Sequence, residues 1–176
     1  MKFENKYVIH ILPVSAVDGE TFDLPKEQNA IIVCTSHNNK YVYQCYRENV
    51  LNLDFPDVQN ANYTGAFNRT HARQIINFVK NLPKEVTDIY VCCEQGASRS
   101  PAVAAFLLSI SGRNDDAVWC NPYYSPNALV YKTLCLEYGL QMSEDSVKMK
   151  VLKNEQAFRM AKQSGECEYE RWELLF

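Results

Sequence analysis

Blocks of apolar residues of strand length recur along the first half of the chain, and they are rich in β-branched residues and bounded by proline or polar clusters. A further segment, residues 41–46, alternates less regularly. The run at 88–92 is expected to lie centrally in a sheet. The clearer predicted strands are residues 6–12 (KYVIHIL), 30–34 (AIIVC), 50–53 (VLNL) and 88–92 (DIYVC).

Apolar residues at helical spacing mark the segments between and after these strands. Residues 68–82 predict an amphipathic helix with Asn68 or Thr70 as its cap, whereas residues 100–111 are apolar on every side and predict a buried helix. A third helix begins at Ser125 and Pro126 and ends at Gly139. The remaining predicted segments are a charged helix at 143–165 and its apolar anchor, WELLF, at 172–176.

Strands that interleave with helices favour an α/β layer fold, here a central, mostly parallel sheet of four to five strands flanked by helices. With 176 residues, 47% of them hydrophobic, the chain is long enough for one well-filled core and slightly more. We therefore expect one domain at residues 1–140. Residues 141–176 are expected to form a helical extension packed on the same domain.

Charge and cysteine usage exclude several classes of protein. A net charge of −3 leaves no broad basic surface for nucleic acid or for an anionic membrane. No segment approaches about 18 uninterrupted apolar residues, and residues 4–6 are polar where a signal peptide needs an apolar run. The seven cysteines form no C-x-x-C pair, which favours thiols over a metal site. The sequence therefore predicts a soluble, cytoplasmic protein without a metal.

The predicted strand at 88–92 runs through CEQGASRS into the predicted buried helix, giving the order Cys93, five residues, Arg99, Ser100. This spacing alone can arise by chance in a chain with seven cysteines. The position of the motif between a strand and a helix indicates that it can bind an anion. Such a loop can turn its backbone N–H groups inward at the positive end of a helix dipole, where they bind a dianion. Gly96 permits the tight curvature.

Each side chain of this motif has a predicted role. The field that binds a dianion also stabilises a thiolate, so Cys93 is the candidate nucleophile. Arg99 can bind two phosphate oxygens side by side, which lysine cannot. Ser100 is expected near the Cys93 sulfur, where its hydroxyl steadies the leaving thiolate, or else it is an ordinary helix N-cap. The predicted phosphate-binding residues are Glu94, Gln95, Gly96, Ala97, Ser98 and Arg99.

Cleavage of a phosphomonoester also needs a proton for the departing oxygen, and hence a carboxylic acid on a separate element. The segment LNLDFPDVQN supplies two candidates, Asp54 and Asp57. Asp57 follows a proline that stiffens the turn and an aromatic residue, Phe55, that can anchor a loop. Asp57 is therefore the preferred general acid. Asp54 and a plain solvated turn remain the alternatives.

The segments CCEQGASRS and FPD resemble the protein-tyrosine-phosphatase superfamily, whose signature is H-C-x-x-G-x-x-R-[S/T] and whose acid often lies in an upstream W-P-D loop. Through RSPAVAAFLL and SPNALVYKTL the chain is similar to small, dual-specificity-like predicted tyrosine phosphatases of bacteria and phages. The resemblance spans roughly residues 6–139. It implies a phosphatase-like catalytic domain, a phosphocysteine intermediate and no metal or cofactor, with Cys93 as nucleophile, Arg99 as clamp, Asp57 as acid and then base, and 94–98 as an amide cradle.

Two positions depart from the superfamily pattern. Cys92 stands where the signature has a histidine that helps to hold the nucleophile, and we expect it to be a core residue that serves this role poorly. Phe55 replaces the tryptophan of the acid loop, as in dual-specificity-like members. Cys34, on a predicted neighbouring strand, is a candidate resolving partner for oxidised Cys93.

The loop also bears on the substrate. Glu94 adds a negative charge and no lysine stands in the loop, which disfavours highly phosphorylated inositides and RNA ends. We expect a phosphorylated protein, with phosphotyrosine preferred, or a small phosphomonoester. The alternatives are a catalytically weak pseudophosphatase that binds phosphorylated partners, a rhodanese-like enzyme and an arsenate-reducing enzyme. Tyrosine against serine or threonine, and the oligomeric state, are left open.

Overall fold

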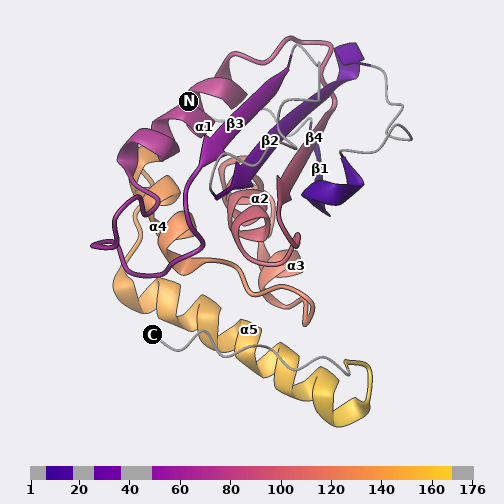
Figure 1. Cartoon of the computed structure of the whole chain (residues 1–176). Coiled ribbons are helices and arrows are strands. Elements are labelled where there is room, and N and C mark those ends of the chain that lie inside the picture. The colour runs from indigo at the N-terminus through magenta and orange to yellow at the C-terminus, as the bar shows by residue number, and fades with distance from the viewer. Residues whose placement is uncertain (1–6, 18–25, 37–48, 168–176) are drawn as a thin grey trace.

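The predicted α/β class is confirmed by a computed structural model that describes residues 7–17, 26–36 and 49–167 (Figure 1). Its described strands form one sheet in the order β1-β4-β2-β3, and every pair is parallel. The strands are β1 (Val8–Pro13), β2 (Asn29–Thr35), β3 (Val50–Asp54) and β4 (Asp88–Cys93). Each matches a predicted strand to within two residues at either end. The fifth prediction, at 41–46, lies outside the described residues.

β4 is an inner strand, as its apolar sequence predicts, and pairs with β1 on one side and β2 on the other. In this register Cys93 lies opposite Pro13 of β1 and Cys34 of β2, while Thr35 lies opposite Asp54 of β3. The last residues of all four strands therefore meet at one edge of the sheet, the edge at which parallel α/β sheets place their ligands.

The helices follow the predicted segments, with two differences at their N-termini. α4 begins at Ala128 rather than at Ser125, because Asn127 is its cap and accepts a hydrogen bond from Val130 N at 3.1 Å. α2 begins at Arg99 with Ser98 at the N-cap position, so the N-cap alternative for Ser100 is wrong. The described α-helices are α1 (Arg69–Lys80), α2 (Arg99–Ile110), α3 (Asp116–Trp119), α4 (Ala128–Tyr138) and α5 (Glu144–Ser164).

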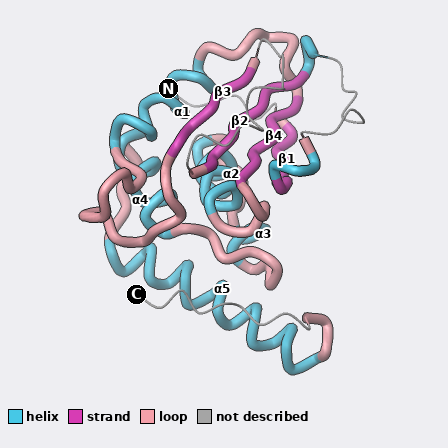
Figure 2. Tube along the Cα trace, in the orientation of Figure 1, coloured by secondary structure: helices cyan, strands magenta, loops and turns pink. Residues whose placement is uncertain are grey.

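α3 was not predicted, because four residues are too few to show helical periodicity. A short 3-10 helix, Val14–Ala16, follows β1, and a second one, Lys26–Gln28, directly precedes β2 (Figure 2). The cap of α1 is Asn68, one of the two residues predicted for it, and its side chain accepts from Thr70 N and His71 N. No helix among the described residues is both long and apolar enough to cross a membrane.

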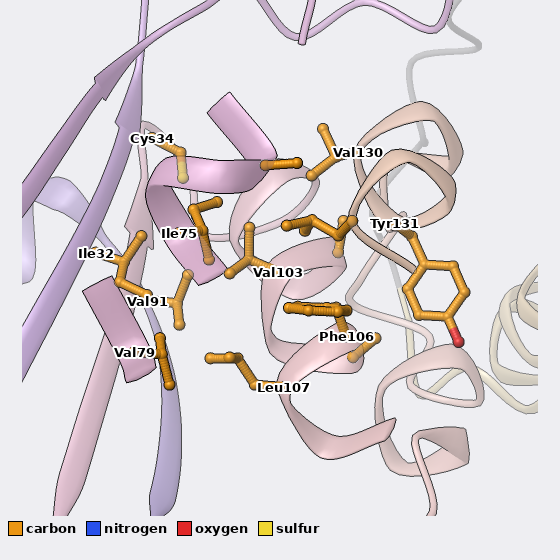
Figure 3. Packing of buried hydrophobic residues seen from close by; sticks show 14 of the residues in the cluster. Ile32, Cys34, Ile75, Val79, Val91, Val103, Phe106, Leu107, Val130 and Tyr131 are labelled. Atoms are coloured by element: carbon orange, nitrogen blue, oxygen red, sulfur yellow. The ribbon is translucent and has the colours of Figure 1, made fainter. Parts of the chain in front are cut away.

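The main core lies between one face of the sheet and helices α1, α2 and α4 (Figure 3). Alternate strand residues such as Ile32 and Val91 point to this face and pack near Val103 and Leu107 of α2. α2 is buried on nearly all sides, as its apolar sequence predicts, since ten of its twelve residues are buried. The helix that begins at the Cys93–Arg99 loop is therefore held rigidly.

The other face of the sheet carries a smaller buried cluster. Cys92 lies in it beside Val33 and Tyr90, and is fully buried. Because successive side chains of a strand point to opposite faces, Cys92 and Cys93 belong to different clusters. Cys92 is thus a core residue, as the sequence predicts.

α5 crosses below α3 and α4 and contacts both (Figure 1). Lys150 Nζ donates to both carboxylate oxygens of the buried Asp115, at 2.7 and 2.8 Å. Asn154 Nδ2 donates to the carbonyl oxygens of Trp119 and Tyr124, at 2.9 and 3.1 Å. Polar contacts therefore tie this helix to the segment between α3 and α4. The predicted WELLF anchor at 172–176 lies outside the described residues.

Candidate active site

A cavity of about 310 Å³ opens at the carboxyl ends of β2, β3 and β4. It contains the predicted nucleophile, clamp and acid together. The residues that line it are Ser36, Asp57, Cys93, Glu94, Gln95, Ala97, Ser98 and Arg99. Every predicted phosphate-binding residue except Gly96 is among them.

Cys93 is the last residue of β4 and only 2% of it is exposed. Its Sγ lies 3.1 Å from Ser100 Oγ, in the first turn of α2. The predicted proximity of Ser100 to the sulfur is thus present, although Ser100 does not line the cavity. A hydroxyl at this distance can donate to a thiolate and stabilise it.

Gly96 makes the sharp bend of the loop between β4 and α2. Its φ is +69°, in the left-handed region. A Cβ at this position would stand 2.8 Å from Pro13 N and 2.9 Å from Leu12 C, both backbone atoms at the end of β1. Glycine is therefore required for both the conformation and the close approach.

The second half of the loop is held by the segment before α4. Ser125 N donates to Ala97 O at 2.7 Å, and Asn127 N donates to Ser98 O at 3.2 Å. These two carbonyl oxygens are therefore directed toward that segment. Ser125, predicted as a helix start, instead braces the loop.

Arg99 is buried, with 4% of the residue exposed, and its guanidinium faces the cavity. Nη1 donates to Phe55 O at 2.9 Å, and Phe55 is itself buried against Phe67 with ring centroids 4.8 Å apart. Nε lies 3.7 Å from Asp57 Oδ2, and Nη2 forms an ion pair with Glu94 Oε2. The clamp residue is thus fixed by a backbone carbonyl and flanked by two carboxylates.

Asp57 lines the cavity, on the segment that follows β3. Its Oδ1 accepts from Ser98 Oγ at 2.9 Å and from Asn127 Nδ2 at 2.7 Å. Asp54, the alternative acid, is the exposed last residue of β3 and is not among the described residues that line the cavity. The geometry therefore favours Asp57.

Two residues of the site were missed by the sequence analysis. Asn127 is fully buried and donates to Asp57, while Ser36 binds Glu94 Oε1 through its backbone N at 2.8 Å and its Oγ at 3.0 Å. Asn127 lies in the segment SPNALVYKTL, but nothing in that segment by itself indicates a contact with Asp57. Ser36 follows a buried strand, which was the one available signal, because polar residues at carboxyl ends of parallel strands gather at ligand sites.

Cys34 lies opposite Cys93 in the sheet and belongs to the same buried cluster. Burial raises the pKa of the Cys34 thiol, and the nearby Cys93 raises it further. Cys34 is therefore protonated at neutral pH. Among the described residues, no group of three or more His, Cys, Asp or Glu side chains is arranged to hold a metal ion.

No protein-family model matches the chain, and no curated protein was found to match it. Among solved structures, the chain is similar to the crystal structure of PTPMT1 in complex with PI(5)P, with a TM-score of 0.41 and 12% sequence identity. The match covers 90% of this chain and 97% of the other. A likeness this distant does not bear on the chemistry of the cavity.

Proposed function

We propose that this chain is a phosphomonoester hydrolase that works through a phosphocysteine intermediate on Cys93, with phosphotyrosine as its preferred substrate. The observation that carries the proposal is the convergence of Cys93, Arg99 and Asp57 on one cavity at the carboxyl edge of the sheet. A nucleophile, a cation for the phosphoryl oxygens and a proton donor are the three groups that such a reaction needs.

In the first step the Cys93 thiolate attacks phosphorus while the phosphoryl oxygens are bound by Arg99 and by the backbone N–H groups of loop 94–98. The S–P bond forms and the P–O bond to the leaving group breaks. Asp57 gives its proton to the departing oxygen. Two hydrogen bonds hold Asp57 Oδ1, from Ser98 and Asn127, and they position the carboxyl group over the cavity.

In the second step water attacks the phosphocysteine and gives a proton to Asp57, which now acts as a base. The S–P bond breaks, inorganic phosphate forms and the thiolate leaves. Ser100 Oγ, 3.1 Å from the sulfur, donates a hydrogen bond to the departing thiolate. The resting enzyme is thereby restored.

Charge and depth support the choice of substrate. Arg99 is the only cationic side chain among the described residues lining the cavity, which suits one phosphoryl group rather than several. The Cys93 sulfur belongs to a residue that is 98% buried, so the phosphoryl group must reach inward. A phosphotyrosine side chain reaches further than phosphoserine or phosphothreonine.

The test compares wild type, Cys93→Ser and Asp57→Asn on two aryl phosphates. C93S should lose more than about 10³-fold in kcat/KM on para-nitrophenyl phosphate. D57N should lose about 10²-fold or more on phenyl phosphate, whose leaving group needs a proton, and less on para-nitrophenyl phosphate. A C93S variant that kept the wild-type rate would refute the proposal.

A phosphopeptide panel then tests the preferred substrate. Phosphotyrosine peptides should be hydrolysed faster than matched phosphoserine and phosphothreonine peptides.

The second candidate function is that of a pseudophosphatase, which binds phosphorylated partners without hydrolysing them. It is favoured by Cys92, which stands where the superfamily that the chain resembles has a histidine that supports the nucleophile. Tight binding of phosphotyrosine peptides by wild type without any turnover would establish that second function and exclude the first.

A further inference from the structure

Arg99, the predicted phosphate clamp, forms an ion pair with a carboxylate from its own loop. Glu94 directly follows Cys93, and its Oε2 forms an ion pair with Arg99 Nη2. The two side chains differ in burial, since 5% of the Arg99 side chain is exposed and 30% of the Glu94 side chain. The cation is thus fixed in the wall of the cavity, whereas the Glu94 side chain is partly exposed and buries its Oε2 against the cation.

Ser36 holds the other oxygen of the same carboxylate. Its backbone N and its Oγ both donate to Glu94 Oε1, at 2.8 and 3.0 Å. Ser36 directly follows β2, so the contact joins two neighbouring strand ends. Glu94 therefore bridges the end of β2 and the clamp, and both of its oxygens are bound.

The orientation of Arg99 decides which of its edges can bind phosphate. Nη1 is committed to the carbonyl oxygen of Phe55 at 2.9 Å. On the Nε–Nη2 edge, Nε is buried without a hydrogen bond to any described residue. Because Nη1 carries a second N–H, a phosphoryl group that binds two donors side by side can use the Nε–Nη2 edge or the Nη1–Nη2 edge, and both include Nη2. Glu94 Oε2 already contacts Nη2.

We propose that Glu94 is a built-in competitor for phosphate at Arg99, held in place by Ser36, and that it sets the anion affinity of the site. The inference rests on the proposed function only in that phosphate binds at Arg99. A phosphate dianion must displace Oε2 from Nη2 and would otherwise face a like charge. Since inorganic phosphate is the product of the proposed reaction, the competitor weakens product binding and eases product release.

A bracing role for Glu94 predicts the opposite result. If the Ser36–Glu94–Arg99 bridge mainly kept loop 94–98 in shape, its removal would loosen the loop and weaken anion binding. If Glu94 competes, its neutralisation strengthens anion binding. The sign of the change in phosphate affinity therefore separates the two roles.

The experiment is calorimetric titration of inorganic phosphate into wild type, Glu94→Gln and Glu155→Gln. Glutamine keeps the size of the side chain and can still accept from Ser36, but it carries no charge. E94Q should bind phosphate roughly tenfold more tightly, the size expected for removing one partly exposed ion pair and one like-charge contact. E155Q removes the same charge from an exposed pair with Arg159 on α5, and its phosphate affinity should equal that of wild type.

Ser36→Ala sharpens the test through a double-mutant cycle. S36A alone should tighten phosphate binding by about two- to threefold, because it removes one of the two donors that hold the competitor. The same substitution in the E94Q protein should have a smaller effect, since the competing charge is already absent. Equal effects of S36A in both backgrounds would overturn the coupling between Ser36 and Glu94.

The outcomes distinguish this inference from the proposed function. Phosphate binding in E94Q that equals or falls below that of wild type overturns the inference, whatever the enzyme hydrolyses. Tighter binding in E94Q supports it, even if no variant turns over a substrate. Activity retained in C93S refutes the proposed hydrolysis and leaves the result for phosphate affinity standing.

Discussion

Two regions of this molecule bury charged side chains, and they do so in different ways. Below the core, at the junction of α3, α4 and α5, Asp115 accepts from Lys150, from Tyr131 OH at 2.7 Å and from Ser109 Oγ at 3.2 Å. At the carboxyl edge of the sheet, Arg99 faces two carboxylates, one of them 3.7 Å away.

The two regions differ in whether the buried charged group has hydrogen-bond partners for all of its polar atoms. At the α5 junction both oxygens of Asp115 are bound at hydrogen-bond distance. At the cavity, Arg99 Nε is buried without a hydrogen bond to a described residue, and the Glu94 carboxylate on the neighbouring Nη2 is the group that we propose phosphate displaces. A saturated buried charge stabilises the fold, whereas an unsaturated one beside a cavity is able to bind. The predictions below test this contrast.

The largest expected effect is on activity at the cavity. Arg99→Lys keeps the charge but loses the planar fork, so kcat/KM on para-nitrophenyl phosphate should fall by about 10²-fold or more. The urea midpoint should change little by comparison. Arg69→Lys, on the exposed Arg69–Glu137 pair, is the matched control and should keep full activity. An R99K enzyme within threefold of wild type would contradict the assignment of the clamp.

The second prediction concerns stability at the α5 junction. Lys150→Met leaves Asp115 buried beside no cation, which should lower the free energy of unfolding by about 2 to 3 kcal/mol in urea denaturation. Activity per folded molecule should be retained. Lys148→Met on the same helix is the control, because 72% of its side chain is exposed, and it should change stability little. Equal stabilities of K150M and K148M would show that the junction is not a structural charge site.

The third prediction concerns Asn127, which positions Asp57 in the proposed mechanism. Asn127→Ser keeps a good helix cap but is too short to reach Asp57, so kcat should fall by about tenfold on phenyl phosphate. The fall should be smaller on para-nitrophenyl phosphate, whose leaving group needs no proton. Equal losses on both substrates would indicate a purely structural role for Asn127.

The smallest expected effect is slow formation of a disulfide between Cys34 and oxidised Cys93. Hydrogen peroxide should oxidise the Cys93 thiolate to a sulfenic acid, and the Cys34 sulfur can then displace water to form a disulfide. The two residues are register partners on strands spaced by about 4.8 Å, within disulfide range.

Burial raises the pKa of Cys34, so its reactive thiolate is scarce at neutral pH and increases as pH rises. We therefore expect slow formation of the Cys34–Cys93 linkage at pH 7 and faster formation at pH 9, measured by mass spectrometry. The Cys34→Ala protein, as control, should show no such linkage. Absence of the linkage in wild type at both pH values would exclude Cys34 as the resolving partner.

Local sequence determined most of the elements and the identity of the central motif. The four described strands are signalled by β-branched runs, and α1 by its apolar spacing together with Asn68. The Cys93–Arg99 loop is contiguous in the chain, so its order between a buried strand and a buried helix is readable from sequence alone. The features predicted correctly are those that depend on residues close together in the sequence.

The tertiary structure alone decided the partners of those residues. Asn127 and Asp57 are 70 residues apart, and Ser36 and Glu94 are 58 apart, so no local pattern links them. The start of α4 was misplaced for the same reason, because Ser125 N is used by Ala97 O in the distant loop. Parallel strand pairing brings these segments to one edge of the sheet, and only this packing shows that Glu94 and Asp57 line the same cavity and that both lie beside Arg99.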